Sequence, residues 1–367
     1  MKRLLCIVSA MDTGGAETFL MKVYRQLNHD LYQMDFCVNK TINFYAQEIQ
    51  QMGGHIYVIP PKTRNPIKWF LGLYHLVKSK KYQYVIRVNE HSLSSLDLLV
   101  AKCAGAKNLI MRSSNASSIG LLKKLTHKMF IFLPRLIPNC KIAPSDLAAH
   151  YTFGNKTKFH ILPNGLDIEA FKFSEENREN IRQELKTQGK FVIGHIGRFN
   201  SQKNHKFLLK IFAEIKKLHP DVVLWLVGKG ELEQEIRKEV IQLGLQNDIR
   251  FLGVRTDIPA LLSAMDILVF PSLFEGMPNT VLEAQTSGLS CLISDTITMQ
   301  VKQTNLVHFM TLNKTAEVWA RQALQIINTQ LLVNRLEMAH KMHERGYDIK
   351  SVAKQFIQLV FGEVIYD

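Results

Sequence analysis

A strand-to-helix connection is predicted by the stretch Pro271-Ser272-Leu273-Phe274-Glu275-Gly276-Met277-Pro278-Asn279-Thr280-Val281-Leu282-Glu283-Ala284. The apolar run before it, 267–270, has the length of a buried strand, and the stretch ends in a helical pattern. Two glutamates stand eight positions apart, with Glu275 expected in the Gly/Pro loop and Glu283 in the first turn of the helix. Because α/β proteins bind ligands where parallel strands end, this stretch predicts both a fold class and a site.

Glu283 has two interpretations at this point. Its carboxylate could accept hydrogen bonds from a ribose or from sugar hydroxyls. Thr280 and Glu283 also have the spacing of a capping box, in which the glutamate only satisfies backbone donors at the start of the helix. The stretch alone leaves both interpretations open.

Short apolar runs alternate with longer helical patterns along the chain, as in parallel βαβ units. The first series of expected strands comprises 4–9, 34–38, 55–59, 84–88, 108–111, 141–143 and 159–162. After a Pro-Asn-Gly turn at 163–165, a second series comprises 191–196, 222–227, 249–251, 267–270 and 290–293. We therefore expect an α/β chain of two Rossmann-like domains, residues 1–165 and 166–349, with parallel sheets facing across a ligand cleft. A final helical pattern within 350–367 could pack on either domain, and we assign it to the first.

Charge is distributed unevenly between these two parts. Residues 1–165 hold 22 Lys and Arg against 8 Asp and Glu, whereas residues 166–367 hold 24 of each kind, so the first part carries the whole net charge of +14. Such a split predicts that the first domain faces an anionic partner: a phosphate-bearing substrate, nucleic acid or an acidic lipid surface. Nucleic acid is the least favoured, because the cations are not interleaved with a recognisable binding module.

The five cysteines are scattered singly, without a C-x-x-C pair or a His cluster at zinc spacing, which favours a reducing compartment and no structural metal. The apolar opening of the chain stops at Asp12, so it predicts a buried strand rather than a signal peptide. No apolar run approaches the length of a membrane-spanning helix. We expect a cytoplasmic protein.

A second polar segment, Gly194-His195-Ile196-Gly197-Arg198-Phe199-Asn200-Ser201-Gln202-Lys203-Asn204-His205, follows the first strand of the second domain. Its two cations, Arg198 and Lys203, could clamp a diphosphate, with two-pronged contacts from the arginine and a point charge from the lysine. They could equally be solvated loop cations. No Asp-x-Asp motif is present to hold a divalent ion, so cations of the protein would have to take its place.

The two segments, together with Val227-Gly228-Lys229-Gly230, the Asn-Gly turn and Asp12-Thr13-Gly14-Gly15-Ala16-Glu17-Thr18, resemble the GT-B-fold retaining glycosyltransferases of family 4, in their exopolysaccharide and capsule branch. The resemblance covers nearly the whole chain. It implies metal-independent transfer of a sugar, with retention of configuration, from a nucleoside-diphosphate sugar to a polysaccharide acceptor. We expect a UDP-sugar rather than a GDP-sugar, and a lipid-linked acceptor.

The resemblance also implies roles for single residues. Arg198 and Lys203 would hold the donor diphosphate, and Glu283 the ribose. Glu275 would hold the donor sugar together with the backbone of Gly276, Met277, Pro278 and Asn279. Arg198, Lys203 and Glu275 are the expected catalytic residues. In the first domain, Gly14 and Gly15 would let the backbone approach a phosphate, where a side chain would block it.

The first domain departs from the family pattern. Related sequences often carry a segment like His-Ser-His-Asn, and here the corresponding residues are Arg112-Ser113-Ser114-Asn115. His91 follows another strand end and could enter the cleft or lie on the surface. The candidates on the acceptor side are therefore His91, Arg112 and Asn115.

The segment Leu121–Arg135 mixes lysines with large apolar residues and predicts contact with an anionic membrane surface; an ordinary packed helix is the competing interpretation. Residues 69–78 have the same ambiguity. Two further functions stay open at this point: a sugar-nucleotide epimerase of the same architecture, and a non-catalytic partner in polysaccharide assembly.

Overall fold

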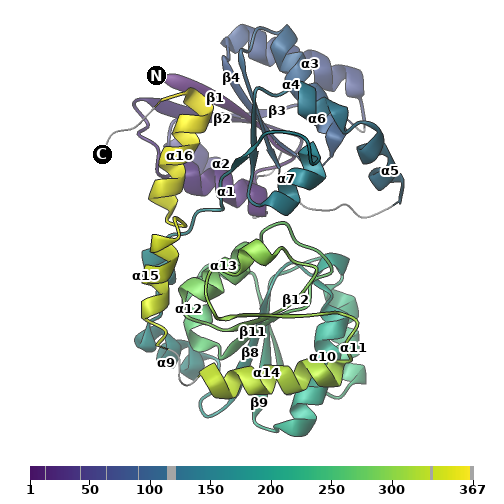
Figure 1. Cartoon of the computed structure of the whole chain (residues 1–367), viewed down its shortest axis with the longest axis vertical. Coiled ribbons are helices and arrows are strands. Elements are labelled where there is room, and N and C mark those ends of the chain that lie inside the picture. Colours follow the sequence, from purple (N-terminus) through teal and green to yellow (C-terminus); the bar gives the residue numbers. More distant parts are fainter. Residues whose placement is uncertain are drawn as a thin grey trace. The chain divides into compact units, whose positions relative to one another are not determined.

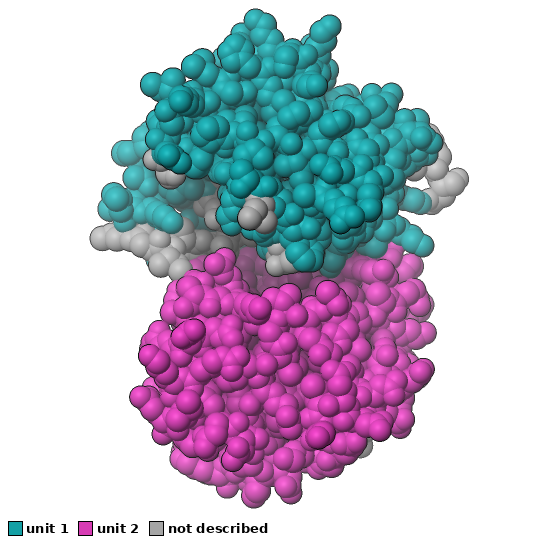
Figure 2. Space-filling model, turned by 180° about the vertical axis from the view of Figure 1, so that it is seen from behind, with its two compact units in different colours: residues 1–165, 349–367 teal, residues 166–348 magenta. Residues whose placement is uncertain are grey.

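The computed structural model describes residues 1–12, 14–41, 43–62, 64–89, 91–113, 121–330 and 334–363. The chain folds into two compact units (Figure 2). Unit 1 comprises residues 1–165 and 349–367, and unit 2 comprises residues 166–348.

Unit 1 is built on a parallel sheet with the strand order β3-β2-β1-β4-β5-β6-β7 (Figure 1). Its strands are β1 Lys2–Ile7, β2 Tyr32–Val38, β3 Ile56–Val58, β4 Tyr84–Asn89, β5 Asn108–Ser113, β6 Cys140–Ala143 and β7 His160–Ile161. Its helices are α1 Gly15–Tyr24, α2 Ala46–Gln51, α3 Pro66–Lys80, α4 Ser95–Cys103, α5 Leu121–Met129, α6 Phe132–Leu136, α7 Asp146–Phe153 and α16 Ile349–Phe361, with a short 3₁₀ turn η1 at Ser92–Ser94. The strands are apolar because both faces of the sheet are covered.

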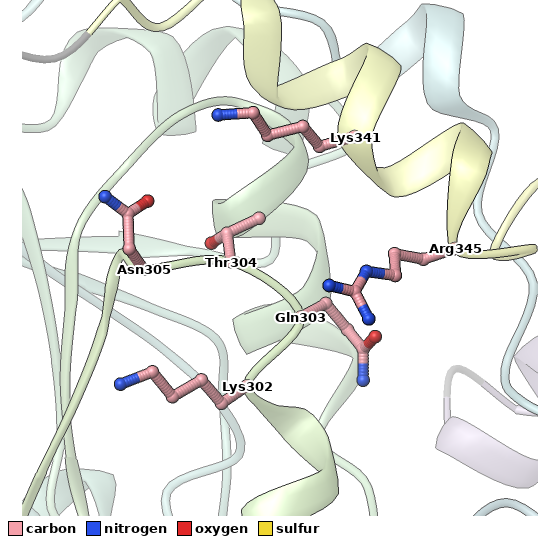
Figure 3. Close-up of a pocket in the computed structure, with 6 residues that line it drawn as sticks. All are labelled: Lys302, Gln303, Thr304, Asn305, Lys341 and Arg345. Carbon is pink, nitrogen blue, oxygen red and sulfur yellow. The ribbon is translucent and has the colours of Figure 1, made fainter.

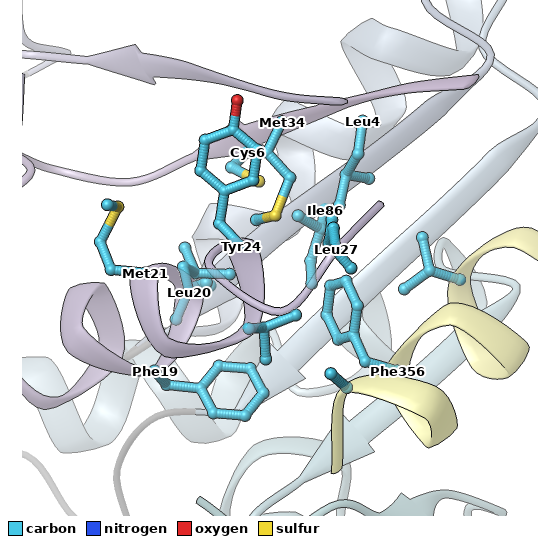
Figure 4. Close-up of a cluster of buried hydrophobic side chains, with 14 of the residues drawn as sticks. Leu4, Cys6, Phe19, Leu20, Met21, Tyr24, Leu27, Met34, Ile86 and Phe356 are labelled. Carbon is cyan, nitrogen blue, oxygen red and sulfur yellow. The ribbon is translucent and has the colours of Figure 1, made fainter. Parts of the chain in front are cut away.

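The C-terminal helix α16 packs in unit 1. Phe356 meets Phe19 of α1 edge to face with ring centroids 6.1 Å apart, in the apolar cluster drawn in Figure 4. Phe361 lies against Tyr32 and Tyr84. The chain leaves unit 1 and returns to it at its end.

Unit 2 has a second parallel sheet, in the order β10-β9-β8-β11-β12-β13. Its strands are β8 Phe191–Ile196, β9 Val222–Val227, β10 Ile249–Gly253, β11 Ile267–Phe270, β12 Cys291–Ser294 and β13 Val307–Met310. Its helices are α8 Ile168–Phe171, α9 Glu175–Glu184, α10 His205–Leu218, α11 Glu233–Gln242, α12 Ile258–Ala264, α13 Asn279–Thr286, α14 Ala316–Gln330 and α15 Glu337–Glu344, with 3₁₀ turns η2 at Ser201–Lys203 and η3 at Met299–Val301. Neighbouring strand residues enter opposite cores, as Trp225 and Leu226 do.

The expected α/β class and its parallel sheets are confirmed, and each expected strand is present with ends shifted by up to a few residues. Strand β13 is not among the strands expected from the sequence. Its run Val307-His308-Phe309-Met310 is short, is interrupted by a histidine and lies at the edge of the sheet.

Candidate functional site

The two polar segments singled out in the sequence lie together at the carboxyl edge of the sheet of unit 2. They follow β8 and β11, which are adjacent parallel strands. The backbone N–H of Leu273 donates to the carbonyl of Gln202 at 2.8 Å, and the Gln202 side chain donates to the carbonyl of Phe274 at 2.9 Å. The Asn204 side chain donates to the carbonyl of Pro271 at 3.1 Å. These bonds join the two loops into one structure.

The charged pair of this site is Lys203 and Glu275. Lys203 Nζ donates to Glu275 Oε1 at 2.7 Å, and the two side chains are only 15% and 12% exposed. The ammonium also lies 4.3 Å from the centre of the Phe270 ring, a cation–π contact. A side chain at Gly197 would place its Cβ 2.9 Å from Lys203 Cε, so glycine leaves the room that the lysine occupies.

The Gly228-Lys229-Gly230 turn supports the loop that carries Arg198. Gly228 has a φ of +133°, and a Cβ there would lie 2.2 Å from the carbonyl oxygen of Gly197. A Cβ on Gly230 would lie 2.3 Å from the carbonyl oxygen of Phe199. Both positions require glycine because two backbone segments approach closely, which is a packing role within this unit.

Arg198 lies at the exposed side of the same loop. Its side chain is 71% exposed, and its Nη2 is 3.2 Å from Glu231 Oε2. An exposed ion pair of this kind is weak in water, so the guanidinium can exchange Glu231 for a ligand at low cost.

Behind Lys203 lies a pair of buried histidines, His195 and His205, whose ring centroids are 4.7 Å apart. His195 Nδ1 donates to the carbonyl of Val269 at 2.9 Å, and the His205 ring stacks on Phe199. Burial, with the nearby Lys203 charge as a smaller cause, lowers the pKa of His205 to about 4, and burial also lowers the pKa of His195. Both rings are therefore neutral at pH 7. Both histidines belong to the polar segment 194–205, but nothing in the sequence pattern places their rings side by side, so no role for them follows from the sequence alone.

The start of α13 bears on the capping-box interpretation of Glu283. The residue before the helix is Pro278, and no side chain caps it. Thr280 is the second residue of the helix and Glu283 the fifth, so the capping-box interpretation is wrong, and Glu283 lies in the second turn rather than the first. Residues Gly276 to Pro278 are buried, and Glu283 is half-buried.

In unit 1, Gly14 and Gly15 begin α1 and are exposed. A Cβ on Gly14 would lie 2.4 Å from Glu17 Oε2, whereas a Cβ on Gly15 would meet no atom within 4 Å. The first N–H groups of a helix point away from it and suit an anion.

Arg112, at the end of β5, is a buried cation. It is 1% exposed, its guanidinium lies 3.6 Å from the centre of the Phe19 ring, and Nη2 donates to Asn164 Oδ1 at 2.5 Å. Among the described residues no carboxylate forms an ion pair with it, and burial lowers its pKa to about 9. Asn115 lies outside the described residues.

His91 is held by its neighbours. Its Nδ1 accepts from the N–H of Leu93 at 3.3 Å, and its Nε2 is 3.1 Å from both the carbonyl of Lys123 and the hydroxyl of Thr126. Both ring nitrogens are engaged by η1 and α5, which gives this histidine a structural role. The acceptor-side candidates thus reduce, in the described part of unit 1, to Arg112.

The α5–α6 segment is packed on one side and exposed on the other. His127 is buried, stacks on Tyr151 and has its Nε2 2.8 Å from the Tyr151 carbonyl. The opposite face shows large apolar side chains with exposed fractions of 75% for Leu122, 56% for Leu125 and 62% for Met129. Lys123, Lys124 and Lys128 are exposed beside them. In the part of the chain that the structure describes, no helix has the length and apolar character needed to cross a bilayer.

Comparison with known proteins finds a family model described as "Glycosyl transferases group 1" that matches residues 176–349. EpsF of Bacillus subtilis (strain 168) is 32% identical over 333 residues, which cover 87% of this chain and 86% of EpsF. The UDP-Gal:alpha-D-GlcNAc-diphosphoundecaprenol alpha-1,3-galactosyltransferase of Escherichia coli is 27% identical over 260 residues, 65% of this chain and 66% of that protein. The crystal structure of Anabaena HepE in complex with UDP-glucose superimposes with a TM-score of 0.82 at 18% identity, and the match covers 99% of this chain and 100% of that one.

Proposed function

We propose a reaction for this chain, which belongs to the glycosyl transferases group 1 family and is a GT-B-fold glycosyltransferase. In this reaction the enzyme moves a sugar from a UDP-sugar to a lipid-linked saccharide, with retention of the anomeric configuration and without a metal ion. The observation that carries the proposal is the joined loop structure of unit 2, which presents Lys203, Glu275 and Arg198 at one edge of the sheet.

The chemistry requires positive charge at the donor phosphate. When the bond from the anomeric carbon to the diphosphate breaks, negative charge develops on the phosphate and oxocarbenium character on the sugar. Cations that are already in place lower this barrier most, because they need no rearrangement during the reaction. Lys203 is largely buried and is fixed by Glu275 and Phe270, and Arg198 is free to turn from Glu231 to a phosphate.

The remaining donor contacts follow from the same loop. Glu275 and the backbone of residues 276–279 bind the sugar hydroxyls, and Glu283 binds the ribose. The support for Glu283 is its place in α13, directly after the loop that carries Glu275, where it is half-buried. In unit 1, the exposed start of α1 at Gly14 and Gly15 offers N–H groups to a phosphate, and the buried charge of Arg112 attracts an anionic part of donor or acceptor without direct contact.

The acceptor and its place in the cell are the second part of the proposal. The Escherichia coli relative is named for a diphosphoundecaprenol-linked acceptor and a UDP-galactose donor. A lipid-linked acceptor requires access to a membrane, and the outer face of α5 combines exposed leucines with lysines. We place the enzyme on the cytoplasmic face of the membrane as a peripheral protein.

A transfer assay tests this function. Purified protein is offered UDP-sugars and GDP-sugars with an undecaprenyl-diphosphate-linked saccharide, and the anomeric configuration of the product is read by NMR. Transfer from a UDP-sugar with retention, unchanged by a chelator, is the expected result. A changed donor sugar formed without acceptor would indicate an epimerase instead, and nucleotide binding without turnover on any acceptor would indicate a non-catalytic partner.

A further inference from the structure

A basic pocket lies in unit 2, away from the loops described above. It has a volume of about 500 Å³ and is lined by Lys302, Gln303, Thr304, Asn305, Lys341 and Arg345 (Figure 3). Lys341 and Arg345 stand four residues apart on and just after α15, so they project from the same side of it. Figure 3 shows both side chains extending from α15 toward the loop that carries Gln303 and Thr304. The lining contains three cations and no carboxylate.

The pocket and the donor loops lie at opposite edges of the sheet. All strands of this sheet are parallel. Residues 302–305 come just before β13, at the amino edge, whereas Lys203 and Glu275 follow β8 and β11 at the carboxyl edge. A ligand in the pocket is therefore not the donor held by Lys203.

The three cations of the pocket are uncompensated. In the described residues, no ion pair involves Lys302, Lys341 or Arg345, and all three are exposed. Ten other cations of unit 2 have carboxylate partners among the described residues: Arg178, Arg182, Arg198, Lys203, Lys206, Lys216, Lys217, Arg237, Arg255 and Arg321. Residues 166–367 are neutral overall, so this concentration of charge is local to the pocket and does not follow from composition.

The wall of the pocket is rigid, because a buried glutamine holds it. Gln285 of α13 is fully buried, and its Oε1 accepts from the N–H groups of Gln303 and Thr304, both at 2.9 Å. Its Nε2 donates to the carbonyl of Val301 at 2.8 Å. The side chain of Gln303 also donates to the carbonyl of Gln300 at 2.5 Å, within the same loop. The site is formed before any ligand arrives, which reduces the ordering that binding would require.

We propose that this pocket binds a phosphate group. The pocket offers three cations and the amide of Asn305, and no carboxylate lines it. These groups suit a ligand that carries two negative charges and several acceptor oxygens, and arginine can bind such a ligand with two parallel hydrogen bonds. The phosphate is either free in solution or the headgroup of an acidic lipid. The inference does not depend on the proposed transferase reaction.

Pyrophosphate is the probe for the first source. Calorimetric titration compares the pocket variant Lys302→Gln/Lys341→Gln/Arg345→Gln with a control variant, Lys210→Gln/Lys238→Gln/Lys314→Gln, which removes the same charge from exposed positions of the same unit. Both are made in the full chain, with and without Lys203→Ala, because the donor loops also attract pyrophosphate. In the Lys203→Ala background we expect the pocket variant to bind pyrophosphate at least about tenfold more weakly, and the control variant to bind as before.

Vesicles are the probe for the second source. Flotation with phosphatidylcholine vesicles, with and without phosphatidylglycerol, uses the same variants. A loss confined to the pocket variant with phosphatidylglycerol supports a lipid headgroup, and a loss in the pyrophosphate titration supports free phosphate. Equal behaviour of pocket and control variants in both assays overturns the inference.

All three substituted positions are exposed, so the triple variant should fold. If it is unstable, the single change Arg345→Gln replaces it and should give a smaller loss of binding in the same assay. If Lys203→Ala changes nothing while the pocket variant loses binding, the donor assignment fails and the pocket stands.

Discussion

The ammonium of Lys203 donates a 2.7 Å hydrogen bond to the carboxylate of Glu275, although 72 residues separate them in the chain. The bond connects the loop after β8 to the loop after β11. It keeps a largely buried cation in place and partly neutralises it. A donor that brings its own negative charge can replace Glu275 as the partner of Lys203, and the carboxylate is then available to the hydroxyls of the sugar.

Replacing Lys203 tests this arrangement directly. Lys203→Ala should lower turnover roughly a hundredfold or more, the scale observed when a prearranged charge-stabilising group is removed. Lys206→Ala is the matched control, because Lys206 is an exposed lysine on α10 that pairs with Glu235. Initial rates at saturating donor distinguish the two variants. Wild-type turnover in folded Lys203→Ala protein would remove this lysine from the mechanism.

Arg198 should behave similarly despite its exposure. Arg198→Ala is expected to lower turnover roughly a hundredfold, since the guanidinium would meet the diphosphate only when the donor is bound. Glu231→Gln serves as the control: it breaks the exposed ion pair of Arg198, and we expect turnover within a few fold of the wild type. If both variants lose the same activity, the ion pair and not the arginine is what matters.

Glu283 should contribute to nucleotide affinity and not to folding. Glu283→Gln loses a charge-assisted bond to the ribose and leaves the start of α13 unchanged, because Pro278 and not a capping box precedes the helix. Titration calorimetry with UDP should show weaker binding, and the melting temperature without nucleotide should stay near that of the wild type. An unchanged affinity would end the ribose assignment.

Part of this site follows from the family resemblance, which implies that Arg198, Lys203 and Glu275 share one donor site. The loops that carry them lie together in the structure because β8 and β11 are adjacent parallel strands, and loops after such strands meet at one edge of a sheet. The bond from Lys203 to Glu275 was not foreseen, because it depends on rotamers that Phe270 and Gly197 select.

Other features have no sequence signal at all. The contact of Arg112 with Phe19 joins two strand-to-helix regions that no motif connects. The basic pocket draws on residues 302–305 and 341–345, and a buried glutamine on a third segment holds the first of these two stretches. Long-range pairs of this kind arise from packing, and neither hydrophobic period nor turn residues encode them.

The buried histidines should make stability depend on pH. In the folded chain the pKa of His205 is lowered to about 4, while the unfolded chain binds the proton near the ordinary value of 6.5. The unfolded state therefore holds more protons between these values, so stability is complete above about pH 6.5 and falls by about 1.4 kcal/mol per pH unit as the pH drops toward 4.

Urea unfolding at several pH values measures this loss. His205→Phe keeps a ring against Phe199 and should flatten the decline between pH 6.5 and 5, whereas His343→Phe, at an exposed position of the same unit, should leave it unchanged. Parallel curves for the wild type and His205→Phe would show that this histidine is accessible to protons in the folded chain.

The outer face of α5 should bring the protein to anionic membranes. Leu122, Leu125 and Met129 are exposed there, and Lys123, Lys124 and Lys128 lie beside them, so we expect flotation with anionic vesicles and little with neutral ones. Each cation near such a surface contributes about 1 kcal/mol, so changing these three lysines to Glu should abolish most of the binding. The control for net charge is a triple variant in which three other exposed lysines of unit 1, Lys102, Lys107 and Lys156, are changed to Glu. Added salt should weaken binding of the wild type, since the screening length is about 10 Å at about 0.1 M. Equal flotation of the two triple variants would show that total charge, and not this helix, draws the enzyme to the lipid.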